Sequence, residues 1–162
     1  MTAEETVVKE LVEKFPFFAE KIRTQRARRL WADVPAEQFE AVAHHLFEKM
    51  GFTMLCSITG LDEGATFGLL YHFGQPSGMM IGLKISIPRE KPEWKTFISM
   101  FPGSELYERE IADLYGVRFE GLPAGLRYPL PDDWPDNEFP LRKDWKPKHA
   151  VATAAPAAEV KS

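Results

Sequence analysis

Residues 54–87, MLCSITGLDEGATFGLLYHFGQPSGMMIGLKISI, decide the fold, because apolar and polar residues alternate along three runs that turn residues separate. The turns lie at Asp62-Glu63-Gly64 and at residues 74–78. The pattern predicts three strands in an antiparallel meander. One face of it would carry Met54, Cys56 and Ile58, then Phe67, Leu69, Tyr71 and Phe73, then Met79, Ile81, Leu83, Ile85 and Ile87. On this face Cys56 would be a small buried hydrophobe.

The opposite face of the meander is more polar than the first. It would carry Thr66, Gly68, His72, Gly82, Lys84 and Ser86. Helices should therefore cover one face, while the other face is wetter or is covered by another protein. We predict an α+β fold in which an antiparallel sheet packs on helices.

Two helices and a strand are expected before the meander. A capping box formed by Thr2 and Glu5 opens a helix over about residues 4–15. A second helix begins at Pro35 and ends before Gly51, with Phe39, Val42, Ala43, Leu46, Phe47 and Met50 at helical spacing. Between them, residues 26–34 are interpreted as a strand at the edge of the sheet, where charge discourages unwanted pairing.

An arginine cluster lies ahead of Leu30, just before this strand and in its first residues. It consists of Arg23, Arg26, Arg28 and Arg29. Edge protection is one interpretation of the cluster, and a docking site for an acidic partner surface is the other.

Two more helices are expected after the meander. Pro88 and Pro92 end the sheet and open a short helix that reaches Phe101. Residues 105–115 form another helix, for which Ser104 is the expected N-cap and Gly116 the left-handed residue after the last turn.

The segment after this helix is predicted to be a long, Pro-rich, extended C-terminal arm over residues 122–149. Five prolines break any helix or central strand between residues 123 and 140, yet Trp134, Trp145 and other apolar residues lie among them. Ordering the arm costs upward of about 25 kcal/mol, whereas burying both tryptophans returns about 10 kcal/mol. The arm is therefore expected to become fully ordered only against a partner subunit. The alternative is an arm folded back over its own domain, which spans residues 1–121.

Composition excludes several classes of protein. The chain has 162 residues, 44% of them hydrophobic, and a net charge of −4, which argues against nucleic acid as the main partner. One cysteine excludes a disulfide framework or a multi-cysteine cluster within the chain. No run approaches the about 20 apolar residues of a membrane span, and no secretory signal is visible. We expect a soluble chain in a reducing compartment, with a disordered tail over residues 150–162.

No nucleotide-binding, zinc-protease or paired-cysteine motif is present, so catalysis would depend on scattered groups. Glu105, Arg109 and Asp113 form an i, i+4, i+8 ladder on one face of the helix over residues 105–115. Glu108 and Glu110 point to nearly opposite sides of that helix and cannot form an acid/base pair. A carboxylate site made by Glu110 and Asp113, which share a face, stays open as an alternative.

Two motifs resemble a known family. Residues 108–116 fit the pattern ERExxDxxG, residues 140–145 read PLRKDW, and Gly121, Pro123, Leu126-Arg127 and Trp134 lie between them. Together they are similar to the signature of the thirty-kilodalton subunit of respiratory complex I, which is also called the C subunit of NADH-quinone oxidoreductase. This family has relatives in energy-converting [NiFe] hydrogenases and formate hydrogenlyase. The similarity is strong over residues 102–145 and looser over the preceding helix and meander.

The resemblance implies a subunit of an oxidoreductase complex that carries no cofactor, metal or catalytic residue of its own. Iron–sulfur clusters and a [NiFe] centre, or quinone and FMN, would belong to partner subunits. The arm would clasp the large catalytic subunit near the small iron–sulfur subunit. The residues assigned to partner binding are Glu108, Arg109, Glu110, Asp113, Arg127, Trp134, Leu141, Arg142, Lys143, Asp144 and Trp145.

The resemblance also implies a place in the cell, on the cytoplasmic side of the inner membrane and attached through partner subunits. Ala112, Leu122 and Tyr128 replace residues usual in complex I members, which favours the hydrogenase type over the NADH-quinone type. The alternatives are a stand-alone protein-binding module and a small enzyme that uses Glu110 and Asp113.

Overall fold

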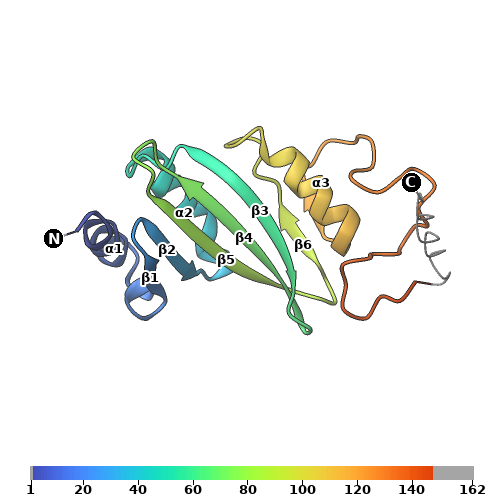
Figure 1. Cartoon of the computed structure of the whole chain (residues 1–162), viewed down its shortest axis with the longest axis horizontal. Coiled ribbons are helices and arrows are strands. Elements are labelled where there is room, and N and C mark those ends of the chain that lie inside the picture. The colour runs from blue at the N-terminus through green and yellow to red at the C-terminus, as the bar shows by residue number, and fades with distance from the viewer. Residues whose placement is uncertain (1, 148–162) are drawn as a thin grey trace, which may run out of the picture.

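A computed structural model describes residues 2–147 and shows a mixed α+β fold, as predicted (Figure 1). The elements in chain order are α1 (Ala3–Lys14), the 3₁₀ helix η1 (Pro16–Glu20), β1 (Ile22–Arg26), β2 (Arg29–Asp33), α2 (Ala36–Glu48), β3 (Met54–Asp62), β4 (Thr66–Gly74), β5 (Met80–Pro88), β6 (Glu93–Lys95), α3 (Ser104–Tyr115) and β7 (Arg118–Glu120). The predicted tail over residues 150–162 lies outside the described residues.

Five strands form the main sheet in the order β1-β2-β5-β4-β3. The meander predicted over residues 54–87 is confirmed, because β3 pairs antiparallel with β4 and β4 with β5. The sheet also has one parallel pair, because β2 runs parallel to β5. Parallel pairing needs a long connection between the strands, and α2, β3 and β4 supply it.

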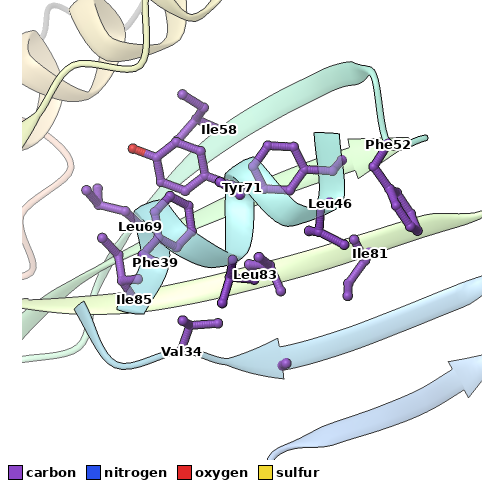
Figure 2. Close-up of a cluster of buried hydrophobic side chains, with 14 of the residues drawn as sticks. Val34, Phe39, Leu46, Phe52, Ile58, Leu69, Tyr71, Ile81, Leu83 and Ile85 are labelled. Carbon is purple, nitrogen blue, oxygen red and sulfur yellow. The ribbon is translucent and has the colours of Figure 1, made fainter. Parts of the chain in front are cut away.

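The strand register separates the two faces of the main sheet. One row runs Ile22, Ala32, Leu83, Tyr71 and Ile58 across the five strands and faces the core. The helix α2 lies over this face and contributes Phe39 and Leu46, both fully buried (Figure 2). The helix α3 packs on the same face, because a Cβ on Gly60, opposite the buried Leu69, would meet Tyr115 and Ile111.

Cys56 is exposed, so its predicted burial was wrong. The pairing of β3 with β4 shifts between Leu55 and Ser57, which leaves Cys56 as the extra residue of a β-bulge. Leu55 packs against the core in its place, while Met54 is 45% exposed. Of the three apolar residues predicted on this face of β3, only Ile58 is buried.

The single strand predicted over residues 26–34 is in fact part of a hairpin. Arg28 adopts a positive φ of 59°, and the turn at Ala27 and Arg28 separates β1 from β2. Because β2 lies between β1 and β5, the edge strand is β1. The start of the hairpin was missed because Lys21 to Arg26 carry little apolar alternation.

The short helix predicted after Pro92 was also wrong. Residues 93–95 form β6, which pairs in parallel with β7. The N–H of Arg118 donates to the carbonyl of Pro92 at 2.8 Å and extends this pairing. The partner strand lies some 25 residues later in the chain, so local periodicity at residues 92–101 could not reveal it.

The C-terminal end of α3 was predicted correctly, but its N-cap was not. Gly116 follows its last turn with φ 71°, as expected, and its N–H bonds to the carbonyl of Ala112 at 2.9 Å. Ser104 is the first helical residue rather than the N-cap, which is Gly103. Ser104 is fully buried and makes no capping hydrogen bond.

Candidate functional site: the arm and its attachment to the domain

Residues 122–147 form no helix or strand and lie back against their own domain (Figure 1). This is the arrangement that the sequence left as the alternative for the arm. The dependence of its order on a partner subunit stays a prediction. We call residues 122–147 the arm below.

Helix α3 holds the first part of the arm through charged side chains. Arg109 donates to Glu105 at 2.8 and 3.1 Å, which confirms this ion pair, and also to the carbonyl of Pro123 at 2.8 Å. Asp113 instead pairs with Arg127, whose Nε lies 2.9 Å from its Oδ1. Its other oxygen accepts the Leu130 N–H at 2.9 Å. The predicted three-residue ladder was therefore wrong at Asp113, which faces the arm.

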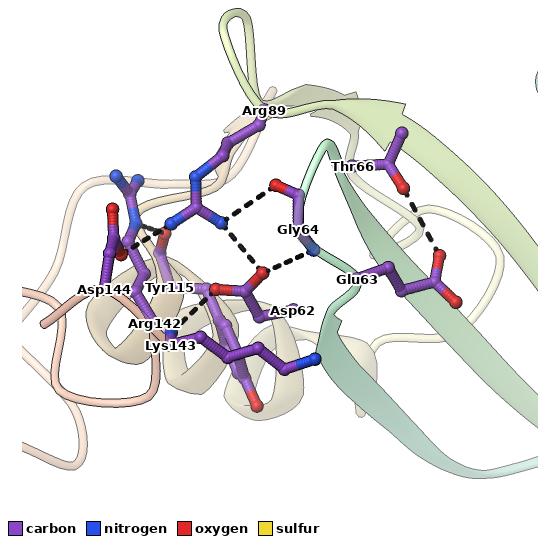
Figure 3. A network of polar contacts seen from close by, with 9 residues as sticks. All are labelled: Asp62, Glu63, Gly64, Thr66, Arg89, Tyr115, Arg142, Lys143 and Asp144. Carbon is purple, nitrogen blue, oxygen red and sulfur yellow. Dashed lines mark hydrogen bonds and ion pairs between the residues drawn. The ribbon is translucent and has the colours of Figure 1, made fainter.

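Asp62, at the end of β3, holds the last part of the arm (Figure 3). Its side chain is 2% exposed and accepts hydrogen bonds from Arg89 and the Lys143 N–H, both 2.8 Å, and from the Gly64 N–H at 2.9 Å. Burial would raise the pKa of this carboxyl, but the bonds from Arg89, Lys143 and Gly64 outweigh it and lower the pKa to about 2. Asp62 therefore stays ionised at neutral pH.

Arg89 and Arg142 make further contacts between the domain and the last part of the arm. Arg89 also pairs with Asp144 of the arm at 2.6 Å. Arg142 donates from Nε to the carbonyl of Tyr115 at 2.7 Å, and its guanidinium lies 4.3 Å from the ring centre of Phe139 and 5.1 Å from that of Phe67. Burial, together with repulsion from Arg89, lowers the pKa of Arg142. We call Asp62, Arg89, Arg142, Lys143 and Asp144 the Asp62 network.

The tryptophans of the arm pack on each other. The ring centres of Trp134 and Trp145 lie 5.9 Å apart. Both indole N–H groups donate to Glu138, from Trp134 to its carbonyl at 2.8 Å and from Trp145 to its carboxylate at 3.3 Å. Both side chains are half-buried within this chain. If they fill a pocket in a partner, that pocket must accept two rings packed at a tilt of 33°.

Other apolar side chains of the arm face solvent. Leu126 is 84% exposed, Leu141 49% and Tyr128 45%. A cavity of about 300 Å³ lies between α3 and the arm, next to two of them. It is lined by Arg109, Ala112, Asp113, Leu122, Gly125, Leu126, Arg127, Tyr128 and Phe139. The arm thus presents apolar groups outward while its charged groups hold it to the domain.

Glu108 and Glu110 differ in their surroundings. Glu108 is fully buried and accepts the Thr96 hydroxyl at 2.6 Å and the Phe97 N–H at 2.7 Å. Burial raises its pKa, although these two bonds oppose the shift. This places the Glu108 side chain inside the domain, and its assigned role in partner binding stays a prediction. Glu110 is half-buried and forms no ion pair or hydrogen bond within residues 2–147, while Asp113 is engaged by Arg127.

Asp62 and Arg89 received no role from the sequence, although both hold the arm. Asp62 appeared only as the end of Thr59-Gly60-Leu61-Asp62, which the family resemblance covers loosely. Only their positions could have pointed to them, because Asp62 and Arg89 each lie where a predicted strand of the meander ends. Distance along the chain hid the contact, since Lys143 follows Asp62 by 81 residues.

Neither a metal site nor a membrane helix is found in the described part of the chain. Within residues 2–147, no three side chains of His, Cys, Asp or Glu are grouped to hold a metal ion. The helices in the same range are too short and too polar to cross a membrane.

Known proteins share both sequence and fold with this chain. Residues 32–151 match the family model described as the respiratory-chain NADH dehydrogenase 30 Kd subunit. The C subunit of NADH-quinone oxidoreductase from Moorella thermoacetica is 37% identical over 116 residues, which are 70% of this chain and 77% of that protein. The membrane-bound hydrogenase subunit beta of Pyrococcus furiosus is 28% identical over 95% of this chain and 94% of that protein.

A solved structure has the same fold. A chain of the membrane-bound sulfane sulfur reductase, described as an archaeal respiratory membrane complex, aligns with a TM-score of 0.79 and 29% identity. The alignment covers 90% of this chain and 86% of that chain.

Proposed function

This chain belongs to the family of the thirty-kilodalton subunit of respiratory-chain NADH dehydrogenase, found in complex I-related membrane oxidoreductases, and we propose that it is a cofactor-free assembly subunit of such a complex. Its arm binds the large catalytic subunit, near the small iron–sulfur subunit. That large partner holds a [NiFe] centre or a quinone site. This chain lies on the cytoplasmic side of the inner membrane and is attached to it only through its partners.

The outward-facing apolar side chains of the arm carry this proposal. Leu126, Tyr128 and Leu141 lie on a segment without regular secondary structure, and each is 45% exposed or more. Single exposed apolar residues are ordinary, but three on one segment, two of them beside an open cavity, are typical of a surface that a partner covers. A partner that buries them gains about 1.5 to 3 kcal/mol for each fully buried leucine.

The ionic contacts of the arm support the same role. Arg109, Asp113 and the Asp62 network hold the two ends of the arm to the domain. A segment that is already positioned loses less conformational entropy when it binds. The charged residues assigned to partner binding thus act first within this chain, where they orient the surface that the partner meets.

The proposal assigns electron transfer to other subunits. Asp113, one of two residues in the alternative enzyme site, forms an ion pair with Arg127. The other oxygen of Asp113 accepts the Leu130 N–H, and within residues 2–147 no hydrogen bond joins Asp113 to Glu110, as an acid/base dyad would require. The role left to α3 is to hold and orient the arm.

Affinity purification from the native organism tests the proposal. With a tag on this chain, we expect a large metal- or quinone-binding subunit and a small iron–sulfur subunit to co-elute. L126D and L141D should remove both subunits from the eluate, whereas A124D, also exposed on the arm, should retain them. A chain that purifies alone, or leucine variants that assemble normally, would show that the arm is not the contact.

A further inference from the structure

The sheet face that α2 and α3 leave open carries unpaired positive charge. Arg23, Arg26 and Arg29 lie at its β1–β2 end, and within residues 2–147 none of them has a carboxylate at ion-pair distance. Lys84, on the same face, is instead neutralised by Glu63 at 2.7 Å and Asp33 at 3.3 Å. The three arginines therefore form a local positive patch on a chain whose net charge is −4.

A groove with an apolar floor lies beside these arginines. One row of the register runs Arg23, Trp31, Gly82, His72 and Ser57 across the sheet, on the face opposite the core row. The groove has a volume of about 400 Å³, and its lining includes Arg26, Arg29, Trp31, His72, Met80 and Gly82. It lies on the far side of the sheet from α2 and α3, so it is separate from the arm.

The floor of the groove is shaped by Gly82. A Cβ at this position would lie 3.3 Å from Trp31 and 3.6 Å from His72, so the missing side chain leaves space between two rings. Burial lowers the pKa of His72, which keeps its imidazole uncharged at neutral pH. The positive charge of the groove therefore comes from the arginines alone, and the floor suits an apolar side chain.

We propose that this groove binds an acidic extended segment of another polypeptide, with carboxylates on Arg23, Arg26 and Arg29 and an apolar side chain over Gly82. Charge complementarity selects the partner, because guanidinium groups pair well with carboxylates. A strand places alternate side chains on one side, as a row of charges beside an apolar floor requires. Three cations on an acidic chain are few for nucleic acid, which binds through many phosphate contacts.

The proposal does not rest on the assembly role of the arm, and the isolated full chain tests it. The probe is a fluorescein-labelled nonapeptide with aspartate at positions 1, 3 and 5, leucine at position 7 and serine elsewhere, so that in an extended strand the acidic and apolar side chains share one side. Its binding is measured by fluorescence anisotropy at low and high salt. We expect saturable binding that weakens with salt. Replacing each aspartate with asparagine should weaken binding at least tenfold, since each exposed ion pair contributes a factor of about two to five.

Two double variants locate the site on the chain. R23Q/R26Q should lower affinity about tenfold, because it removes two of the three proposed contacts with carboxylates. Both arginines are exposed and neither forms an ion pair, so the variant should keep the fold. The matched control K91Q/R118Q also removes two exposed positive charges, but near β6 and β7, and should bind the peptide normally. Circular dichroism confirms that each variant is folded.

Three results would overturn the proposal. The first is an absence of saturable binding, and the second is equal binding by R23Q/R26Q and the wild type. The third is tighter binding of a single-stranded oligonucleotide than of the peptide, which would identify a general polyanion site instead.

Discussion

The carboxyl group of Asp62 joins three separate segments of the chain. It accepts hydrogen bonds from Arg89 after β5, from the turn at Gly64 and from Lys143 in the arm. All three donors favour the ionised form, which is why the pKa falls to about 2 despite burial of the side chain. The position of the last part of the arm therefore depends partly on the charge of Asp62.

We expect D62N to loosen the arm. The asparagine keeps the shape of the side chain but loses charge-assisted bonds, so the free energy of unfolding should fall by about 2 kcal/mol. Urea denaturation measures this loss, and hydrogen exchange at the Lys143 amide should become faster. D132N, an exposed aspartate of the arm, serves as the control and should change neither quantity.

The effect of D62N should also depend on pH. The pKa of Asp62 is lower in the folded chain than its ordinary value of 3.8, so its contribution to stability is complete above that value. It is lost as the pH falls toward about 2, where the wild-type carboxyl takes up a proton. Wild type and D62N should converge in stability over this range, and a constant difference would contradict the assignment.

Glu108 is the opposite case, a carboxylate whose burial raises the pKa. E108A should lower the free energy of unfolding by about 3 kcal/mol or more, because the Phe97 N–H loses its buried acceptor. E108Q keeps an acceptor and removes the charge, so its loss should be below about 1 kcal/mol and should shrink as the pH rises. Urea denaturation separates the two variants.

E108Q also tests whether Glu108 contacts a partner subunit. If E108Q folds normally but fails to co-purify with partner subunits, Glu108 acts at an interface and its placement inside the domain is not its main role. Normal assembly of E108Q would agree with the structure.

At the scale of elements, α3 connects the core to the arm. Ile111 faces the sheet, whereas Arg109 and Asp113 face the arm. Gly116 ends the helix where the arm returns, and a Cβ there would lie 2.5 Å from Arg142 and 2.6 Å from Phe139. The end of α3 therefore needs glycine for two reasons, its positive φ and the close approach of the arm.

G116A should be more destabilising than G51A. Both glycines have φ near 70°, so each alanine costs about 1 kcal/mol for the left-handed backbone. Only at Gly116 does the methyl group meet other atoms, which adds about 1 to 3 kcal/mol of overpacking. Thermal and urea unfolding measure the two losses, and equal losses would show that the arm does not pack closely there.

Sequence predicted the elements whose signal is local. The helix α2 and the strands β4 and β5 followed from apolar spacing within single segments. The elements that were missed depend on distant partners. β6 forms by pairing with β7, β2 joins β5 in parallel, and the bulge at Cys56 depends on the register with β4.

The site was predicted in part for the same reason. Arg127 and Arg142 were assigned to binding a partner subunit, which stays a prediction, and within this chain they contact Asp113 and Tyr115 of α3. The sequence could show that charges gather near the arm. It could not show which charges pair, because pairing requires the fold to bring residues 62, 89 and 144 together.

At the scale of the whole molecule, the arm is held to the domain at separate residues rather than along its whole backbone. The N–H of Leu130 and that of Lys143 bond to carboxylates of the domain. In the part of the chain that the structure describes, the N–H groups of Leu126 and Tyr128 have no hydrogen-bond acceptor. This pattern predicts local differences in opening rather than one rigid unit.

Hydrogen exchange on the isolated chain should reveal this order. Amides of β4 and β5 should exchange slowest, those of Leu130 and Lys143 at an intermediate rate, and those of Leu126 and Tyr128 fastest. Binding to the partner subunits should slow the last group most. If the whole of residues 122–147 is as protected as β5 in the isolated chain, the arm needs no partner to be ordered.

The parallel pairing of β2 with β5 has a consequence for synthesis. Arg29 pairs with Met80, so the N-terminal hairpin must wait on the ribosome until β5 has emerged before it can join the sheet. During that interval one edge of β2 has no strand beside it and is open to pairing with another chain.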